Sequence, residues 1–174
     1  MSTATQPLTG TFTADPIHSS FQFAVKHMKV ATFRAGFDDV EARLVDGVLE
    51  GRAKVESLTV TNPPELREHL VSSDDFFAGQ DIVFSSTSVD LAEDGTATVE
   101  GDLTIKGITK PVTATGTYQQ PVEDPYGGVR SALELSATLD RRDWDLNWQA
   151  PLPSGEDVLA WDVTLSVNLE LVRQ

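Results

Sequence analysis

The chain has 174 residues, a length that suits one domain with a sizeable core, and we expect a single domain over 1–174. A formal net charge of -14 at pH 7, with no basic stripe for phosphates, argues against nucleic acid as a partner. The same charge argues against sustained docking on an anionic membrane surface, though not against brief collision. Because the chain has no cysteine, disulfides, zinc–thiolate sites and thiol nucleophiles are excluded.

The N-terminal stretch MSTATQPLTG has no basic start followed by an apolar run, so we expect no signal peptide. No segment approaches the roughly 20 consecutive apolar residues that a membrane-spanning helix needs. Together these features predict a cytoplasmic protein with no stable membrane insertion. A chain from which a leader had been removed would have the same features.

The first half of the chain contains one clear strand signal and one helix signal. Phe21 and Phe23 alternate with polar residues, which is the two-residue period of a strand with one dry face. The stretch TNPPELREHLVSS predicts a short helix near 63–72. Its prolines suit a first helical turn, and Leu66 and Leu70 recur at helical spacing.

The second half predicts long strands over 96–105, 111–118, 129–139 and 159–171. The last is the clearest, because every odd position in it is apolar and most even positions are polar. Turn signals separate these runs. They fall at 46–47, 93–95, 106–107, 124–128 and 153–157.

About eight long antiparallel strands and one short helix predict an all-β protein, an extended eight-stranded antiparallel β-barrel. Closure of the sheet removes the edges that long strands would otherwise expose. The interior of such a barrel is filled by side chains or holds one small ligand. Small residues on the predicted inner face leave room for a ligand or fit a tapering packed core. They are Ala97, Gly101, Ala114, Gly116 and Ala137.

The three histidines do not form a metal motif. His18 and His27 are nine residues apart, so on an unbroken strand they face opposite sides and lie roughly 30 Å apart. A three-histidine site completed by His69 is therefore not expected. We interpret them as structural or ligand-orienting groups, and ligation of haem by a single histidine stays open. No metal or cofactor is predicted.

No catalytic motif stands out. The chain has no Gly-x-Ser-x-Gly nucleophile elbow and no glycine-rich phosphate loop. The stretch RRDWDLNW at 141–148 could cover a pocket mouth or grip a polar head group, or it could hold buried tryptophans and surface ion pairs. Asp74 and Asp75 are adjacent to Phe76 and Phe77. We expect the two aromatic side chains to fill apolar space while the aspartates stay in water.

Five motifs, taken in order, span nearly the whole chain. They are DPIHSSFQFAVKH (15–27), HLVSSDDFF (69–77), FSSTSV (84–89), GDLTIKGITKPV (101–112) and RRDW (141–144). In these motifs the chain resembles the YceI-like family, whose members are β-barrel proteins often called polyisoprenoid-binding proteins. The resemblance implies a lipocalin-like barrel whose apolar tunnel holds a long isoprenoid chain, from a polyprenyl compound or an isoprenoid quinone.

The resemblance has departures. Asp145 stands where the family usually has glycine, the stretch 69–77 is one residue longer than usual, and the stretch after Phe77 lacks the usual Tyr-Pro. These changes fall near the expected tunnel-mouth loops. Many relatives are secreted to the periplasm, whereas this sequence predicts a cytoplasmic location.

The main hypothesis is a non-enzymatic carrier or store of a long isoprenoid lipid. The loop at 141–151 and the helix are expected to border the opening, where Trp144, Phe76 and Phe77 would contact the ligand near its head, with Arg142 nearby. The predicted lining residues are Phe21, Phe23, Phe84, Leu103, Leu133, Leu135, Trp161 and Val163.

Two alternatives come from other classes. An enzyme at the barrel mouth would use His69, Asp74 and Arg142 as acid–base and anion-holding groups, and a haem- or metal-binding barrel is a variant of it. An interaction module with a solid barrel core would have no continuous cavity. A homodimer is compatible with any of these hypotheses.

Overall fold

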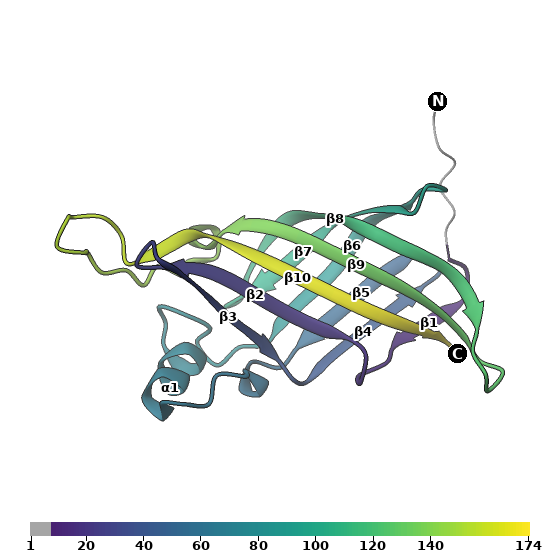
Figure 1. Ribbon diagram of the computed structural model, residues 1–174, viewed down its shortest axis with the longest axis horizontal. Coiled ribbons are helices and arrows are strands. Elements are labelled where there is room, and N and C mark those ends of the chain that lie inside the picture. Colours follow the sequence, from purple (N-terminus) through teal and green to yellow (C-terminus); the bar gives the residue numbers. More distant parts are fainter. Residues whose placement is uncertain (1–7) are drawn as a thin grey trace.

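The computed structural model describes residues 8–174, so residues 1–7, on which the signal-peptide expectation largely rests, lie outside the described residues. Within this range, ten strands, one α-helix and two short 3-10 helices form an elongated barrel (Figure 1). The strands are β1 (Thr11–Ala14), β2 (Ser20–His27), β3 (Ala31–Phe37), β4 (Val40–Val45), β5 (Val48–Ala53), β6 (Ile82–Leu91), β7 (Thr96–Ile105), β8 (Ile108–Glu123), β9 (Val129–Asp140) and β10 (Leu159–Arg173). The helices are η1 (Val55–Ser57), α1 (Pro64–Ser72) and η2 (Arg141–Trp144).

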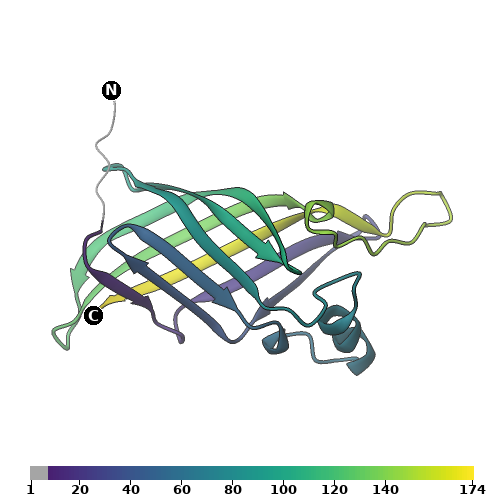
Figure 2. The same ribbon diagram turned by 180° about the vertical axis from the view of Figure 1, so that it is seen from behind.

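The ten strands form a closed barrel of eight strands, because two of the barrel strands are each interrupted and consist of two shorter strands. β10 pairs with β2 along its first part and with β1 near its end, so β1 and β2 share one position. β3 pairs with β2 and β4 pairs with β1, which makes β3 and β4 the next composite strand. From β4 the antiparallel ladder runs through β5, β6, β7, β8 and β9 back to β10 (Figures 1 and 2). The predicted all-β, eight-stranded, lipocalin-like barrel is confirmed.

The segment that contains α1 covers one end of the barrel, beside β3 (Figure 2). There the outer edge of β3 meets a loop, whose Thr59 N–H donates to the Gly36 carbonyl at 2.8 Å. The α1 helix begins at Pro64 and buries Leu70 and Val71, close to the prediction of a helix near 63–72. Among the helices of residues 8–174, none has both the length and the apolar character that crossing a bilayer requires.

Tight turns lie where the sequence signals predicted them. Asp46 and Gly47, between β4 and β5, have φ of 48° and 84°. Lys106 and Gly107, between β7 and β8, have φ of 55° and 75°. Two consecutive residues with positive φ match the twist of the flanking strands in a two-residue hairpin.

The small inner-face residues serve two different purposes. A Cβ at Gly101 would lie 2.5 Å from the Ser85 carbonyl oxygen, and a Cβ at Gly116 would lie 1.7 Å from that of Glu134. These glycines therefore allow neighbouring strands to approach closely. Ala114 instead leaves space, because it lines a cavity, as does Ala137.

The barrel interior divides into a packed end and a hollow end. The packed end lies near β1 and is filled by a cluster that includes Phe12, Leu44, Leu133 and Leu171, all with no exposed surface. A second apolar cluster surrounds the hollow end near α1. Leu133, predicted as tunnel lining, belongs to the packed end and lies outside both cavities, because neighbouring side chains of the cluster fill the interior around it.

Candidate functional site

Two neighbouring cavities occupy the barrel interior. The inner one has a volume of about 100 Å³ and the outer one about 240 Å³. Phe21, Ile82 and Leu165 line both, so the two spaces adjoin along the barrel axis. Their walls are almost entirely apolar, which is what the one-sided alternation of the strands produces.

Phenylalanine rings form one wall of the outer cavity. Phe23 and Phe37 project inward from β2 and β3, and Phe77 reaches them from the loop after α1. The Phe77 ring meets Phe23 at 6.2 Å and Phe37 at 5.7 Å between centroids, both edge-on. Such edge-to-face contacts add to the energy of burial and hold the wall in shape.

Trp144 forms a wall of the outer cavity rather than its mouth. The side chain is 2% exposed, and its indole N–H donates to the Leu103 carbonyl at 3.0 Å. This hydrogen bond satisfies the polar atom of a buried ring and ties η2 to β7. Trp144 is therefore part of the barrel core as well as part of the cavity lining.

The mouth of the outer cavity is marked by its partly exposed lining residues. They include His27 at the end of β2 and Leu66 on α1. Next to Leu66, an aromatic rim consists of His69, Phe76 and Trp148. Phe76 stacks on Trp148 at 6.2 Å between centroids, and the His69 ring meets Phe76 edge-on at 5.1 Å. Asp74 and Asp75 point to solvent, as expected.

A buried arginine lies beside the outer cavity. Arg141 is 4% exposed and donates to the carbonyls of Ala160 at 2.9 Å, Leu146 at 2.6 Å and Leu159 at 3.2 Å. Burial lowers the pKa of Arg141 to about 10, which leaves the guanidinium charged at neutral pH. Arg141 is one of the residues that line the outer cavity, so a charged residue contributes to a mostly apolar wall.

Two predicted ligand contacts are on the outside of the barrel instead. The Arg142 guanidinium binds the Asp140 carboxylate at 2.6 Å, and Trp161 is stacked by Arg141 at 4.2 Å and by Arg142 at 4.8 Å. The β10 register shifts between Leu159 and Val163, so alternation is broken at Trp161. Neither Arg142 nor Trp161 lines a cavity.

The other predicted residues lie against the cavities, apart from Leu133. Three residues of the outer cavity were not among the predicted lining residues: Trp148, His27 and His69. The loop that carries Trp148 and the helix that carries His69 were nevertheless expected to border the opening. Trp148 is the last residue of the stretch RRDWDLNW at 141–148, and its aromatic side chain was the sequence feature that could have predicted a lining role. Along the cavities lie Phe21, Phe23, Phe76, Phe77, Phe84, Leu103, Leu135, Trp144 and Val163.

Arg142, the candidate anion-holding group, does not line the outer cavity that His69 lines. His69 packs against the aromatic rim, whereas Arg142 is held by Asp140 on the outer surface. Asp74, the other candidate, is exposed to solvent two residues before Phe76 of the rim.

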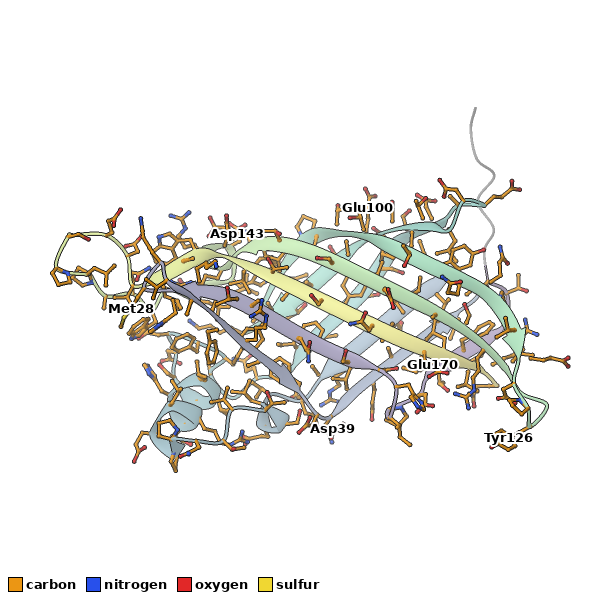
Figure 3. All side chains as sticks on the ribbon, viewed as in Figure 1. Met28, Asp39, Glu100, Tyr126, Asp143 and Glu170 are labelled. Atoms are coloured by element: carbon orange, nitrogen blue, oxygen red, sulfur yellow. The ribbon has the colours of Figure 1, made fainter. Side chains whose placement is uncertain are left out.

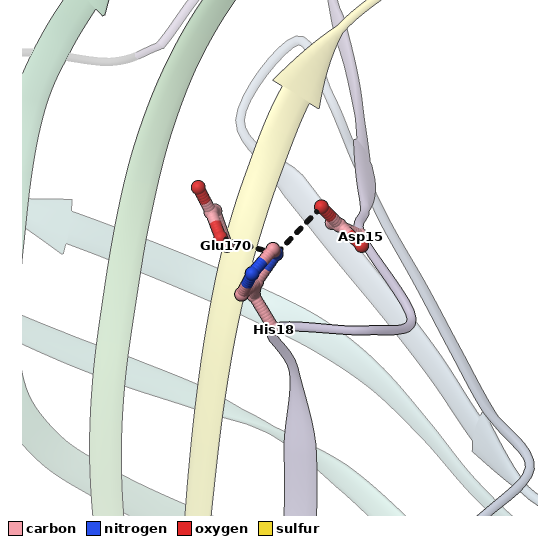
Figure 4. Close-up of side chains that lie close together, drawn as sticks. All are labelled: Asp15, His18 and Glu170. Carbon is pink, nitrogen blue, oxygen red and sulfur yellow. Dashed lines mark hydrogen bonds and ion pairs between the residues drawn. The ribbon is translucent and has the colours of Figure 1, made fainter.

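His18 belongs to a polar cluster at the packed end. Its Nδ1 lies 2.9 Å from Asp15 and 3.2 Å from Glu170 (Figure 4). Arg130 lies 3.0 Å from Asp15. The ligand atoms of the first three lie within 4.8 Å of one another, as a metal site would require. Arg130 already supplies positive charge there, so we interpret the cluster as a structural ion-pair network that fixes the break between β1 and β2.

This network shifts the pKa values of its members. The hydrogen bond with Asp15, followed by the charge of Glu170, raises the pKa of His18 above its ordinary value. The hydrogen bonds from His18 and from the Ile17 backbone hold the pKa of Asp15 well below its ordinary value. Both shifts favour the charged forms of the two side chains.

Known proteins share both the sequence pattern and the fold. The YceI-like domain family matches residues 12–171. A UPF0312 protein of Ectopseudomonas mendocina is 29% identical over 165 residues, which cover 90% of this chain and 83% of the relative. A UPF0312 protein of Staphylococcus aureus is 29% identical over 168 residues, which cover 91% and 95%.

Solved structures share the barrel at lower identity. BcnA of Burkholderia cenocepacia has a TM-score of 0.72 at 17% identity, over 92% of this chain and 99% of BcnA. A polyisoprenoid-binding domain of Saccharophagus degradans has a TM-score of 0.69 at 13% identity, over 95% of this chain and 99% of that domain. At such identities the likeness describes the fold.

Proposed function

Because the chain belongs to the YceI-like family, we propose that it binds a long-chain isoprenoid lipid in the two adjoining cavities. The ligand would be a polyprenyl compound or an isoprenoid quinone, and the protein would carry or store it without a catalytic step. The observation that carries this proposal is the pair of apolar cavities. They adjoin along the barrel axis, and the outer one reaches the surface at one end.

The energetics of the cavities suit a hydrocarbon tail. Burial of apolar surface contributes about 25 cal/mol per Å², before the costs of binding are subtracted. A prenyl chain needs no polar partners, and the walls offer few. The similarity in fold to a polyisoprenoid-binding domain of Saccharophagus degradans supports the same ligand class.

The polar groups at the mouth suit the head of such a lipid. His27, His69 and the indole of Trp148 lie where the outer cavity reaches the surface, and Arg141 contributes a charged residue to its wall. A phenol, carbonyl or phosphate oxygen at the mouth would find donors there, while the tail extends past Phe21 to the inner cavity.

Native mass spectrometry of the purified protein, combined with organic extraction, tests the proposal. We expect a one-to-one adduct whose extracted mass identifies an isoprenoid, or uptake of an added polyprenol by the empty protein. Protein that is empty in every preparation and binds no added prenyl lipid contradicts the proposal.

A further inference from the structure

The turn between β2 and β3 has an unusual backbone for its sequence. The Val30 N–H donates to the His27 carbonyl at 3.2 Å, which closes the turn. Met28 and Lys29 between them have φ of 52° and 61°. Glycine, asparagine and aspartate are the residues that favour two consecutive positive φ angles, so a Met-Lys pair here is strained.

This turn presents apolar side chains to solvent. Met28 is 45% exposed and Val30 is 84% exposed, and the side chains of Lys26 and Lys29 accompany them. Apolar residues flanked by lysines are the composition of segments that rest in the interface of a lipid bilayer. We call Met28, Lys29 and Val30 the hairpin tip.

The hairpin tip is adjacent to the mouth of the outer cavity. His27, the residue before it, lines that cavity. The Met28 N–H donates to the Val158 carbonyl at 2.6 Å, and the next residue, Leu159, lines the same cavity. Figure 3 shows Met28 at the end of the barrel opposite Tyr126. A surface that met the hairpin tip would therefore also meet the mouth.

The charges around the hairpin tip balance, which suits contact with an uncharged lipid surface. At the hairpin tip, Lys26 and Lys29 offset Glu156 and Asp157, and Lys29 binds Glu156 at 2.6 Å. The opposite end also exposes apolar side chains, among them Ile17 and Tyr126, but it lies away from the mouth of the outer cavity (Figure 3). The net charge of -14 argues against an anionic membrane as the partner, so we expect the bilayer to be zwitterionic.

We infer that the hairpin tip docks transiently on a zwitterionic lipid bilayer, with Met28 and Val30 inserted in the headgroup region. The mouth then faces the membrane, and a prenyl lipid moves between bilayer and cavity without crossing water. The transfer rests on the proposed function, whereas the docking does not require a bound lipid.

Co-flotation with phosphatidylcholine vesicles that contain no isoprenoid tests the docking. The test variant is Met28→Asn with Val30→Ser, because asparagine accepts the positive φ at position 28 and should preserve the fold. The matched control is Ile17→Ser with Tyr126→Ser, which removes side chains that are 84% and 94% exposed at the opposite end. Circular dichroism checks that both variants are folded.

We expect the wild type and the control to float equally, and the vesicle partition coefficient of the tip variant to fall about tenfold. A wild type that does not float, a tip variant that floats normally, or an equal loss in the control overturns the inference. Polyprenol binding in detergent solution is measured separately. Its absence would contradict the proposed function and leave a tip-dependent flotation standing.

Discussion

Tyr118 holds a buried hydroxyl with no hydrogen-bond partner among the described residues. Its ring is 3% exposed and packs in the cluster of the packed end. A buried polar atom without a partner loses its hydration without compensation. This makes Tyr118 a residue whose polar atom opposes folding.

Replacement of Tyr118 by phenylalanine removes that hydroxyl and keeps the ring. We expect the free energy of unfolding to stay the same or rise by about 1 kcal/mol, measured by urea denaturation. Tyr126→Phe, at a position that is 94% exposed, is the control and should have no effect. A clear loss of stability in Tyr118→Phe would mean that a water molecule satisfies the hydroxyl.

His18 should make stability depend on pH. Its raised pKa means that its contribution is complete below about pH 6.5, the ordinary histidine pKa, and is lost as pH rises through the folded-state pKa. We therefore expect His18→Gln to destabilise the protein more at about pH 5.5 than at about pH 9. Urea unfolding of both proteins at each pH measures this, and an equal difference at both would contradict it.

Phe76 in the aromatic rim should contribute to the proposed ligand binding. Phe76→Ala removes its contacts with His69 and Trp148, and we expect prenyl-lipid affinity to fall about tenfold, since an aromatic contact is worth roughly 1 kcal/mol or more. Fluorescence titration with a polyprenol measures the affinity. Unchanged affinity in a folded variant would place the head of the ligand elsewhere.

Individual strands differ in how well their sequence predicts them. β10 was predictable because its apolar residues alternate over almost its whole length. The breaks that divide β1 from β2 and β3 from β4 were not, because pairing with a neighbouring strand defines them. The inner face of β10 was wrongly extended to Trp161, since a bulge changes which side a residue faces without any mark in the alternation.

Gly116 should be essential for the packing of β8 on β9. A Cβ there would lie 1.7 Å from the Glu134 carbonyl oxygen, so Gly116→Ala must displace the backbone. We expect a loss of about 3 kcal/mol in the free energy of unfolding. Gly51→Ala is the control, because its nearest neighbour would be 3.7 Å away, and it should change stability by less than about 1 kcal/mol. Equal effects would contradict this account.

The whole molecule is a barrel with one filled end and one hollow end. The sequence predicted that the sheet closes into a barrel and which face of each strand points inward. It left open whether the interior is hollow, because packed and hollow barrels share the same alternation of apolar and polar residues. Leu133 and Leu135 illustrate this. Both face inward from β9, yet Leu133 is packed and Leu135 lines the inner cavity.

The depth of the inner cavity should limit the length of the lipid tail. Ala137→Leu adds volume to its wall, so we expect affinity for the longest bound polyprenols to fall while shorter ones bind as before. Ala132→Leu on the same strand is the control, because Ala132 lines neither cavity. Titration with polyprenols of graded length measures both. A uniform loss for all lengths would contradict the prediction.

The pairing of β1 with β10 also determines when the protein can fold. These strands are separated by almost the whole chain, and the ladder between them closes the ring. During synthesis, residues as far as Arg173 must leave the ribosome before β1 can pair fully with β10, so the barrel cannot close while β10 is incomplete. Until then its apolar inner faces remain open to chaperones and to aggregation, which is the kinetic consequence of a seam between distant strands.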